Sequence, residues 1–273
     1  MLLLGVDLAW GTRARTGLAA VDEAGGLVEL TTLRTDDEIL GWLRPRMEEG
    51  CLVAFDAPLI VRNDTGMRDC ERLVGRYFGR FGIGCHAANR SMPVFADGGR
   101  AARLARELSL DVAPASTARR RAIEVYPHPA IVQLFELDSA LRYKQKPGRD
   151  LELLRHELVR LLDHLESLEA ADPPLALRRH PAWGQVRRSV AAARRKTQLR
   201  AVEDAVDAVV CAYVALLAHL RPDRVRVLGG TDGYLVVPAD PERAHRTGGR
   251  TTYCSTADWK LRSIHGRRPQ TSM

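Results

Sequence analysis

The first apolar run of this chain ends in a carboxylate. Residues 2–6 read Leu-Leu-Leu-Gly-Val, which is typical of a strand buried on both faces, and Asp7 follows directly. An unpaired charge buried in such a place would cost a large part of a domain's stability. Asp7 therefore either forms a turn at the end of the strand or binds a cation at the edge of a sheet.

Other acids follow the same pattern. A second apolar run ends in Asp56, and Glu124 lies in a predicted strand over residues 122–126. Asp204 and Asp207 are three residues apart on a nearly apolar predicted helix, so they share one face. Acids in the first turn of a helix interact favourably with its dipole, which explains Asp204 better than the deeper Asp207.

The order of the predicted elements indicates an α/β protein. After the first strand come two strands joined by the turn at residues 24–26, then a helix, and then the strand that ends in Asp56. We expect this last strand to return beside the first. The predicted organisation is a mixed sheet flanked by helices in one domain over residues 1–238, a helical insertion over about 150–195, and an Arg-rich C-terminal extension over 239–273.

Composition narrows the choice of partners and compartment. The formal net charge of +7 is carried mostly by arginine, which favours nucleic acid as a partner, although arginines on solvated faces are the alternative explanation. No apolar run approaches the roughly 18 residues of a membrane helix, and no secretion signal is recognisable, so we expect neither a membrane partner nor export. Five scattered cysteines are typical of reduced thiols in the cytoplasm. The sequence does not decide whether the chain forms a homodimer.

Carboxylates gathered from distant positions are suited to binding Mg²⁺ or Mn²⁺. Mg²⁺ prefers oxygen ligands and is usually held by one or two carboxylates together with a substrate phosphate. Two metal ions about 4 Å apart can stabilise both the attacking and the leaving oxygen of phosphodiester hydrolysis. Each acid alone is explained as a cap or a turn former. Their recurrence on several buried elements favours a shared cation site.

A series of motifs resembles a known family. In chain order they are GVDLAWG, AFDAPL, NDTGMRDCERL, IEVYPHP, YK and EDAVDAVVCAYVA. From residue 2 to about residue 238 the chain resembles the domain-of-unknown-function family numbered 429, whose members are described as predicted RNase H-like nucleases. The last motif is also similar to the last catalytic helix of Holliday-junction resolvases of the RuvC type. The resemblance implies an RNase H-like fold and a metal-dependent nuclease, a hydrolase acting on phosphodiester bonds.

The resemblance also implies roles for individual acids. Asp7 would be the central ligand that bridges two Mg²⁺ or Mn²⁺ ions, and Asp56 and Asp207 would be the other metal ligands. Asp204 would assist Asp207 in the catalytic set. Glu124 stands on a later strand than the family's usual fourth-strand acid, so as a further catalytic residue it would line the cleft without having to touch the metal.

Several cations are candidates for contacts with substrate phosphates: Arg68, Lys144, Arg194, Arg195 and Lys196. Arg68 and Lys144 lie in the family motifs, and the other three belong to a basic segment that leads into the acid-bearing helix and would guide a polyanion toward it. As the alternative, all are ordinary surface cations. His128 lies between two prolines and is either a general base or a turn histidine hydrogen-bonded to the backbone.

Two further classes of function remain open. A nucleotide-binding phosphotransferase of the actin-like branch shares the core fold, but its phosphate loops have only faint counterparts here, GVDLAWGT and VLGGTDG. A non-catalytic nucleic-acid-binding module would use the acids as caps and the arginines as contacts. The sequence gives neither the substrate (DNA, RNA or a nucleotide), nor whether the chain is catalytically active, nor its pathway.

Overall fold

A five-stranded mixed sheet forms the centre of the protein. The computed structural model describes residues 1–11 and 14–239. The strands are β1 (Leu2–Asp7), β2 (Thr16–Asp22), β3 (Leu27–Leu33), β4 (Cys51–Phe55), β5 (Arg120–Glu124), β6 (Val225–Gly230) and β7 (Gly233–Pro238). The helices are α1 (Asp36–Leu43), α2 (Asp69–Phe78), α3 (Arg100–Glu107), α4 (Pro127–Leu134), α5 (Leu151–Ser167), α6 (Pro181–Ala192) and α7 (Lys196–Leu220). Short 3₁₀ turns occur at Arg44–Met47, Gly79–Phe81, Pro93–Phe95, Leu168–Ala170 and Pro222–Arg224.

The strand order in the large sheet is β3–β2–β1–β4–β5, and β6 and β7 form a separate hairpin. β1 pairs antiparallel with β2 and parallel with β4, β2 and β3 are antiparallel, and β4 and β5 are parallel. The strand over residues 51–55 thus returns beside the first strand, as predicted. The expected α/β architecture, an RNase H-like mixed sheet flanked by helices, is confirmed.

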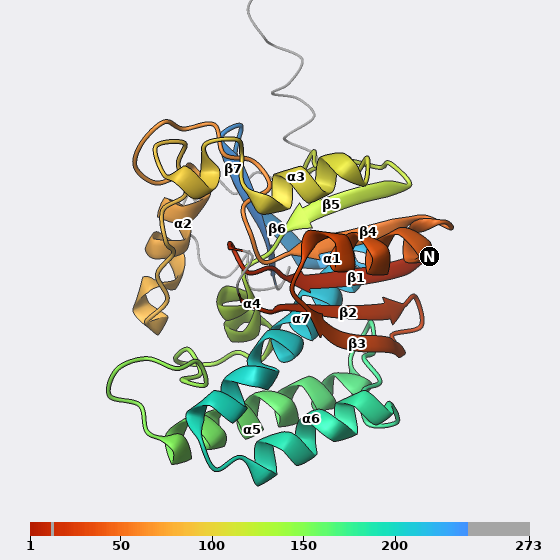
Figure 1. The fold of residues 1–273 in the computed structure, drawn as a ribbon, viewed down its shortest axis with the longest axis vertical. Helices are drawn as coiled ribbons and strands as arrows, with labels where there is room; N and C mark the ends of the chain where they lie inside the picture. The colour runs from red at the N-terminus through yellow and green to blue at the C-terminus, as the bar shows by residue number, and fades with distance from the viewer. Residues whose placement is uncertain (12–13, 240–273) are drawn as a thin grey trace, which may run out of the picture.

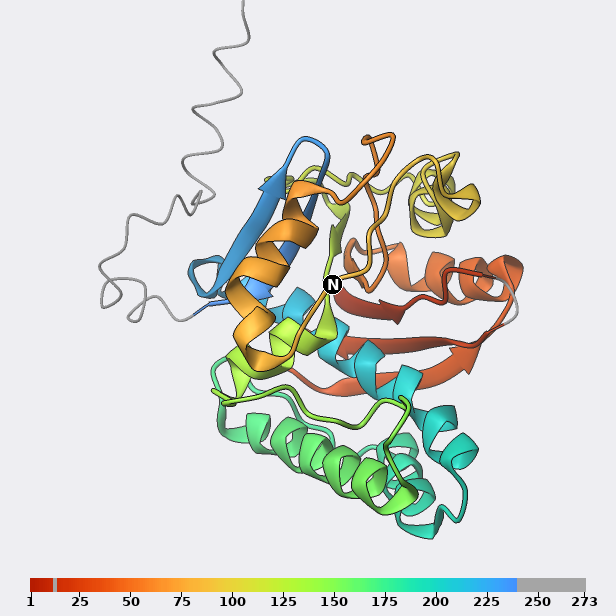
Figure 2. The same ribbon diagram turned by 90° about the vertical axis from the view of Figure 1, so that its left-hand side faces the viewer.

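Helices cover both faces of the sheet (Figure 1). On one face, alternate strand residues such as Leu3 and Leu52 pack into a hydrophobic core with α4, α5, α6 and α7. On the other face, their neighbours Leu4 and Val53 pack against α1 and α3. Figure 2 shows the hairpin β6–β7 beside α2, on which it packs. Because side chains alternate along a strand, the position of each acid in its strand decides which face it reaches.

Two glycines allow α7 to lie unusually close to the sheet. A Cβ atom on Gly5 would lie 1.9 Å from the carbonyl oxygen of Ala208, and one on Gly17 would lie 1.8 Å from that of Asp204. Any other residue at these positions would push the helix away from β1 and β2. The glycines therefore bring the acid-bearing part of α7 against the strand that ends in Asp7.

The structure also changes two local expectations. α7 begins at Lys196, so Asp204 lies more than two turns inside the helix and its carboxylate is not explained as a partner of the helix dipole. His128 lies in the first turn of α4 and not in an irregular turn. The predicted domain boundaries at 238 and 150–195 stay predictions, and residues 240–273 of the Arg-rich extension lie outside the described residues. Among the described helices, none is long and apolar enough to cross a membrane.

Candidate functional site

The pairing of two parallel strands brings Asp7 and Asp56 together. Gly5 pairs with Ala54 and Val6 with Phe55, and the Asp56 amide donates a hydrogen bond to the Val6 carbonyl oxygen over 2.9 Å. The two acids follow in the same register at the carboxyl ends of β1 and β4. Since they are two residues beyond Gly5 and Ala54, both are on the sheet face that α7 covers. Their carboxyl groups are close enough for each to affect the pKa of the other.

Helix α7 supplies the remaining acids at this edge. Asp207 is fully buried and Asp204, one turn earlier, is half-buried. Both lie close enough to Asp7 for their charges to raise its pKa. We call Asp7, Asp56, Asp204 and Asp207 the acidic cluster. The chain thus brings together acids that are far apart in the sequence, as the sequence predicts.

Lys144 is the cation that faces the acidic cluster. Its ammonium group forms an ion pair with Asp207 Oδ2, and the neighbouring Tyr143 hydroxyl donates a hydrogen bond to Asp207 Oδ1 over 2.7 Å. Tyr143 is fully buried, whereas 29% of the Lys144 side chain is exposed. The sequence predicted a phosphate contact for Lys144. The structure places it at the cluster, where both oxygens of Asp207 have partners.

Burial and like charges set the protonation behaviour of the cluster. Burial, opposed by Lys144 and reinforced by Asp207, raises the pKa of Asp56 to about 7. The same causes raise the pKa of Asp7 well above its usual value, and burial together with Asp207 raises the pKa of Asp204 to about 6. Burial by itself would lower the pKa of Lys144. The charges of Asp207 and Asp7 outweigh this effect and raise the pKa well above its usual value, so the lysine stays charged. Perturbed acids that converge in this way are characteristic of functional sites.

Two further groups lie beside the cluster. Glu203 was not predicted as a site residue, and His128 was considered only with two alternative roles. Glu203 is buried, its Oε1 atom lacks a hydrogen-bond partner, and burial with the nearby Asp207 raises its pKa to about 7. His128 lies between the rings of Tyr126 and Tyr143, with ring centroids 5.8 and 5.4 Å away. Burial and the charge of Lys144 lower the pKa of His128 to about 4. His128 is therefore a neutral imidazole at neutral pH.

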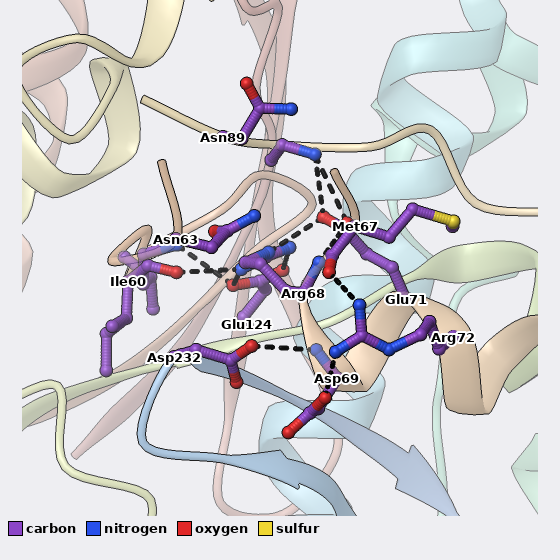
Figure 3. A network of polar contacts seen from close by, with 12 residues as sticks. Ile60, Asn63, Met67, Arg68, Asp69, Glu71, Arg72, Asn89, Glu124 and Asp232 are labelled. Atoms are coloured by element: carbon purple, nitrogen blue, oxygen red, sulfur yellow. Dashed lines mark hydrogen bonds and ion pairs between the residues drawn. The ribbon is translucent and has the colours of Figure 1, made fainter. Parts of the chain in front are cut away.

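Glu124 belongs to a different group of side chains (Figure 3). Arg68 donates to both of its carboxylate oxygens, over 2.6 and 2.9 Å, and the Leu59 amide donates over 3.0 Å. The same guanidinium donates to Glu71 over 2.7 Å and to the Ile60 carbonyl oxygen over 3.0 Å. We call Arg68, Glu71 and Glu124 the Arg68 network. Burial raises the pKa of Glu124, and Arg68 acts against this shift.

The alternation of side chains directs Glu124 and Asp56 to different faces of the sheet, although both residues line the same small cavity. Glu124 pairs in register with Phe55, which packs on the face covered by α1 and α3, whereas Asp56 comes one residue later and points to the other face. Arg68 is 1% exposed and its donors are engaged by the network. These contacts favour a structural role for both residues, and the predicted catalytic role of Glu124 and phosphate contact of Arg68 stay predictions.

The basic segment lies at the start of α7. Arg194 and Arg195 are exposed and Lys196 is partly buried. Cations at a helix N-terminus oppose the helix dipole, so this placement does not serve the stability of α7. With a rise of 1.5 Å per residue, Lys196 lies about 12 Å along the helix from Asp204. The basic segment and the acids Asp204 and Asp207 thus belong to the same helix, about two turns apart.

An exposed aromatic side chain lies near Asp56. Trp10 is 36% exposed, and its ring meets those of Phe95 and His86 edge-on at centroid distances of 5.0 and 6.4 Å. Trp10, His86 and Asp56 line the same small cavity of about 80 Å³. The only sequence signal for this feature was the position of Trp10 three residues after Asp7.

The donor set of the cluster suits a hard divalent cation. Asp7 and Asp56 present carboxylate oxygens side by side, and Mg²⁺ is commonly held by one or two carboxylates with water and substrate completing the shell. Within residues 1–11 and 14–239, however, no group of three or more acidic, histidine or cysteine side chains is arranged around one metal position. The oxygens of Asp207 are instead engaged by Tyr143 and Lys144. The residues fit a cation at Asp7 and Asp56, and Asp207 as third ligand stays a prediction.

The fold and the cluster define the class: an α/β protein with an RNase H-like sheet and half-buried carboxylates at the ends of its parallel strands. The model of the family "Protein of unknown function (DUF429)" matches residues 5–242, and the chain belongs to this family. The family resemblance seen in the motifs is thereby confirmed. Neither the curated proteins nor the solved structures contain a match.

Proposed function

We propose that this protein is a phosphodiesterase that depends on Mg²⁺ or Mn²⁺ and hydrolyses nucleic acid. The observation that carries the proposal is the convergence of Asp7, Asp56 and Asp207 from two strands and a helix, where burial and, after it, the crowding of like charges raise the pKa of Asp7 and Asp56. Such crowding is unfavourable for the protein alone. A divalent cation relieves it, since it favours the ionised carboxylates.

The residues in and beside the cluster have different proposed roles. Asp7 and Asp56 would hold the metal, which supplies Lewis-acid activation of the phosphate and of a water nucleophile. Lys144 offers a charged hydrogen-bond donor beside them, and its pKa, raised by Asp207 and Asp7, keeps it protonated. Asp204 and Glu203 add negative charge at the same side of α7. Mounting these groups on strand ends and a buried helix keeps their positions constant through the reaction.

Features around the cluster support nucleic acid as the substrate. The net charge of +7 and the exposed Arg194 and Arg195 favour a polyanion. Trp10 offers a flat apolar surface of the kind on which bases stack. Cys51, Cys70, Cys85 and Cys211 are free thiols, which supports our proposal that the protein works in the cytoplasm.

Cleavage assays test the proposal. Labelled single- and double-stranded DNA and RNA are incubated with the full chain in Mg²⁺, in Mn²⁺ and in a chelator. We expect metal-dependent products from at least one substrate and a loss of roughly 10³-fold or more in rate for Asp7→Asn, since a metal ligand is removed. The matched control is Asp64→Asn, because Asp64 is 87% exposed and its ion-pair partner is Arg90, which does not belong to the cluster.

Two results would contradict the proposal. Absence of metal-dependent products from every substrate would do so, as would equal rates for the wild type and Asp7→Asn. If the protein instead binds oligonucleotides without cleaving them, and Asp7→Asn leaves or improves that affinity, the chain is a binding module. Its acids would then act only as structural groups.

A further inference from the structure

We propose that Lys144 takes the place of a second metal ion at this site. In this arrangement the site binds one divalent cation at Asp7 and Asp56, and the ammonium group of Lys144, positioned by Asp207, provides the other positive charge for the phosphate. The inference rests on the metal dependence in the proposed function. It replaces the two-ion site that the family resemblance implies with a site of one ion and one lysine.

The first observation is that Asp207 already has two partners. Lys144 pairs with Oδ2 and Tyr143 donates to Oδ1 over 2.7 Å, in a place where Asp207 is wholly inaccessible to solvent. Each oxygen of Asp207 thus has a donor in place, and a second metal ion bound at Asp207 would have to compete with both donors. We therefore assign Asp207 as the positioning residue for Lys144 and Asp7 and Asp56 as the metal ligands.

The second observation is that the backbone holds Lys144 in position. On its N-terminal side, the Arg142 amide donates to Glu157 over 2.8 Å and the Tyr143 ring is buried in the core. On its C-terminal side, Arg149 donates to the Lys144 carbonyl oxygen over 2.8 Å. A lysine anchored on both sides loses little entropy when it binds a ligand, unlike a surface lysine.

The third observation is the position of the positive charge. The ammonium group of Lys144 lies against Asp207, on the helix that packs over β1 and β4. A second divalent ion held between Asp207 and the strand-end acids would lie beside this ammonium group. Like charges at short range in a partly dry site repel strongly, so Lys144 and a second ion exclude each other.

The role of Lys144 in the reaction is electrostatic. In phosphodiester hydrolysis the oxygen of water bonds to phosphorus, one P–O bond breaks, and the leaving oxygen takes its electron pair and then a proton. A fixed ammonium group stabilises the negative charge that grows on the phosphate oxygens, without giving up its own proton. A preorganised charge of this kind does what a second metal ion does in two-metal sites.

Calorimetric titration with Mn²⁺ tests the inference on the full chain. We expect the wild type to bind one Mn²⁺ per chain. In Lys144→Met the cluster gains net negative charge, so we expect either a second bound Mn²⁺ or affinity at least about tenfold higher at the single site. Lys144→Arg keeps the charge and should still bind one ion. The matched control is Lys146→Met, two residues away and exposed, which should behave as the wild type.

Every outcome of the titration either supports or overturns the inference. Two Mn²⁺ ions in the wild type, or unchanged number and affinity in Lys144→Met, would overturn the inference while leaving a metal-dependent nuclease intact. No Mn²⁺ binding by the wild type would overturn both the inference and the proposed function. Circular dichroism checks that Lys144→Met is folded. If it is not, Lys144→Gln replaces it, and the wild-type stoichiometry tests the inference in either case.

Discussion

Two groups of buried or half-buried carboxylates lie at the same edge of the sheet, and they differ in how their charge is compensated. In the Arg68 network, one guanidinium and three backbone amides satisfy Glu71 and Glu124 at normal hydrogen-bond distances. In the acidic cluster, four carboxylates share Lys144, and burial with like charges raises the pKa of three of them. The carboxylates of the Arg68 network have their charge compensated within the protein, whereas an added cation would stabilise the ionised form of the acidic cluster.

The difference teaches that a buried acid indicates function through its partners and not through its burial. Glu124 and Asp56 both end a parallel strand beside an apolar core. Glu124 meets an arginine whose fork-shaped guanidinium matches both carboxylate oxygens. Asp56 meets another carboxyl group. Mutations that remove one partner should therefore have opposite effects on stability in the two groups.

The largest effect is expected from Arg68→Met. This change leaves Glu71 and Glu124 buried without their cation, which should lower the free energy of unfolding by about 3–5 kcal/mol. Urea denaturation followed by circular dichroism measures it. Arg72→Met is the control, since its ion pair with Asp69 is exposed and should contribute less than about 1 kcal/mol. Similar losses for the two variants would remove the distinction between the groups.

A smaller effect of opposite sign is expected from Asp56→Asn in the metal-free protein. The pKa of Asp56 is raised to about 7, so the folded protein binds this proton more tightly than the unfolded chain does, and stability is lost as pH rises from about 4 through 7. At about pH 8 the asparagine should raise the free energy of unfolding by roughly 1–2 kcal/mol. At about pH 4 it should change little.

Urea denaturation at both pH values, with a chelator present, measures this difference. Asp64→Asn is the matched control, because that acid is exposed and its variant should follow the wild type at both pH values. A variant Asp56→Asn that is less stable than the wild type at about pH 8 would show that Asp56 is satisfied in the folded protein, as Glu124 is.

The smallest effect on stability is expected from the exposed cations. Replacing Arg194, Arg195 and Lys196 together by glutamine should change the free energy of unfolding by about 0.5 kcal/mol or less, since these residues lie at the surface. Their proposed role is in binding. The affinity for an oligonucleotide should fall, and the slope of its logarithm against that of salt concentration should decrease by about 2–3. Anisotropy titrations at several salt concentrations measure both, and an unchanged slope would exclude phosphate contacts.

Much of the fold could be predicted because local patterns determine it. The apolar runs that end in Asp7 and Asp56, the turn at residues 24–26 and the apolar helix carrying Asp207 all appear in the structure as expected. Parallel pairing of β1 with β4 then places two of these acids side by side. These features depend on residues that are close in the sequence or on one strand pairing.

The rest of the site depends on contacts between distant segments. The ion pair of Lys144 with Asp207 and that of Arg68 with Glu124 join residues more than 50 positions apart, and a motif that contains one partner does not name the other. The start of α7 at Lys196 was also missed, because Gln198 and the basic residues obscure the beginning of the apolar pattern. Strand alternation did indicate that Glu124 and Asp56 belong to different faces of the sheet, once their register was known, but not that both line one cavity.

The central claim is that the acidic cluster binds a divalent cation and that the Arg68 network does not. Its most direct test is thermal unfolding with increasing Mn²⁺ for the wild type, Asp7→Asn and Glu124→Gln. Because a ligand that binds only the folded state stabilises it, Mn²⁺ should raise the melting temperature of the wild type and of Glu124→Gln, but not that of Asp7→Asn. Equal Mn²⁺ shifts for the wild type and Asp7→Asn, or a shift lost only in Glu124→Gln, would contradict the account.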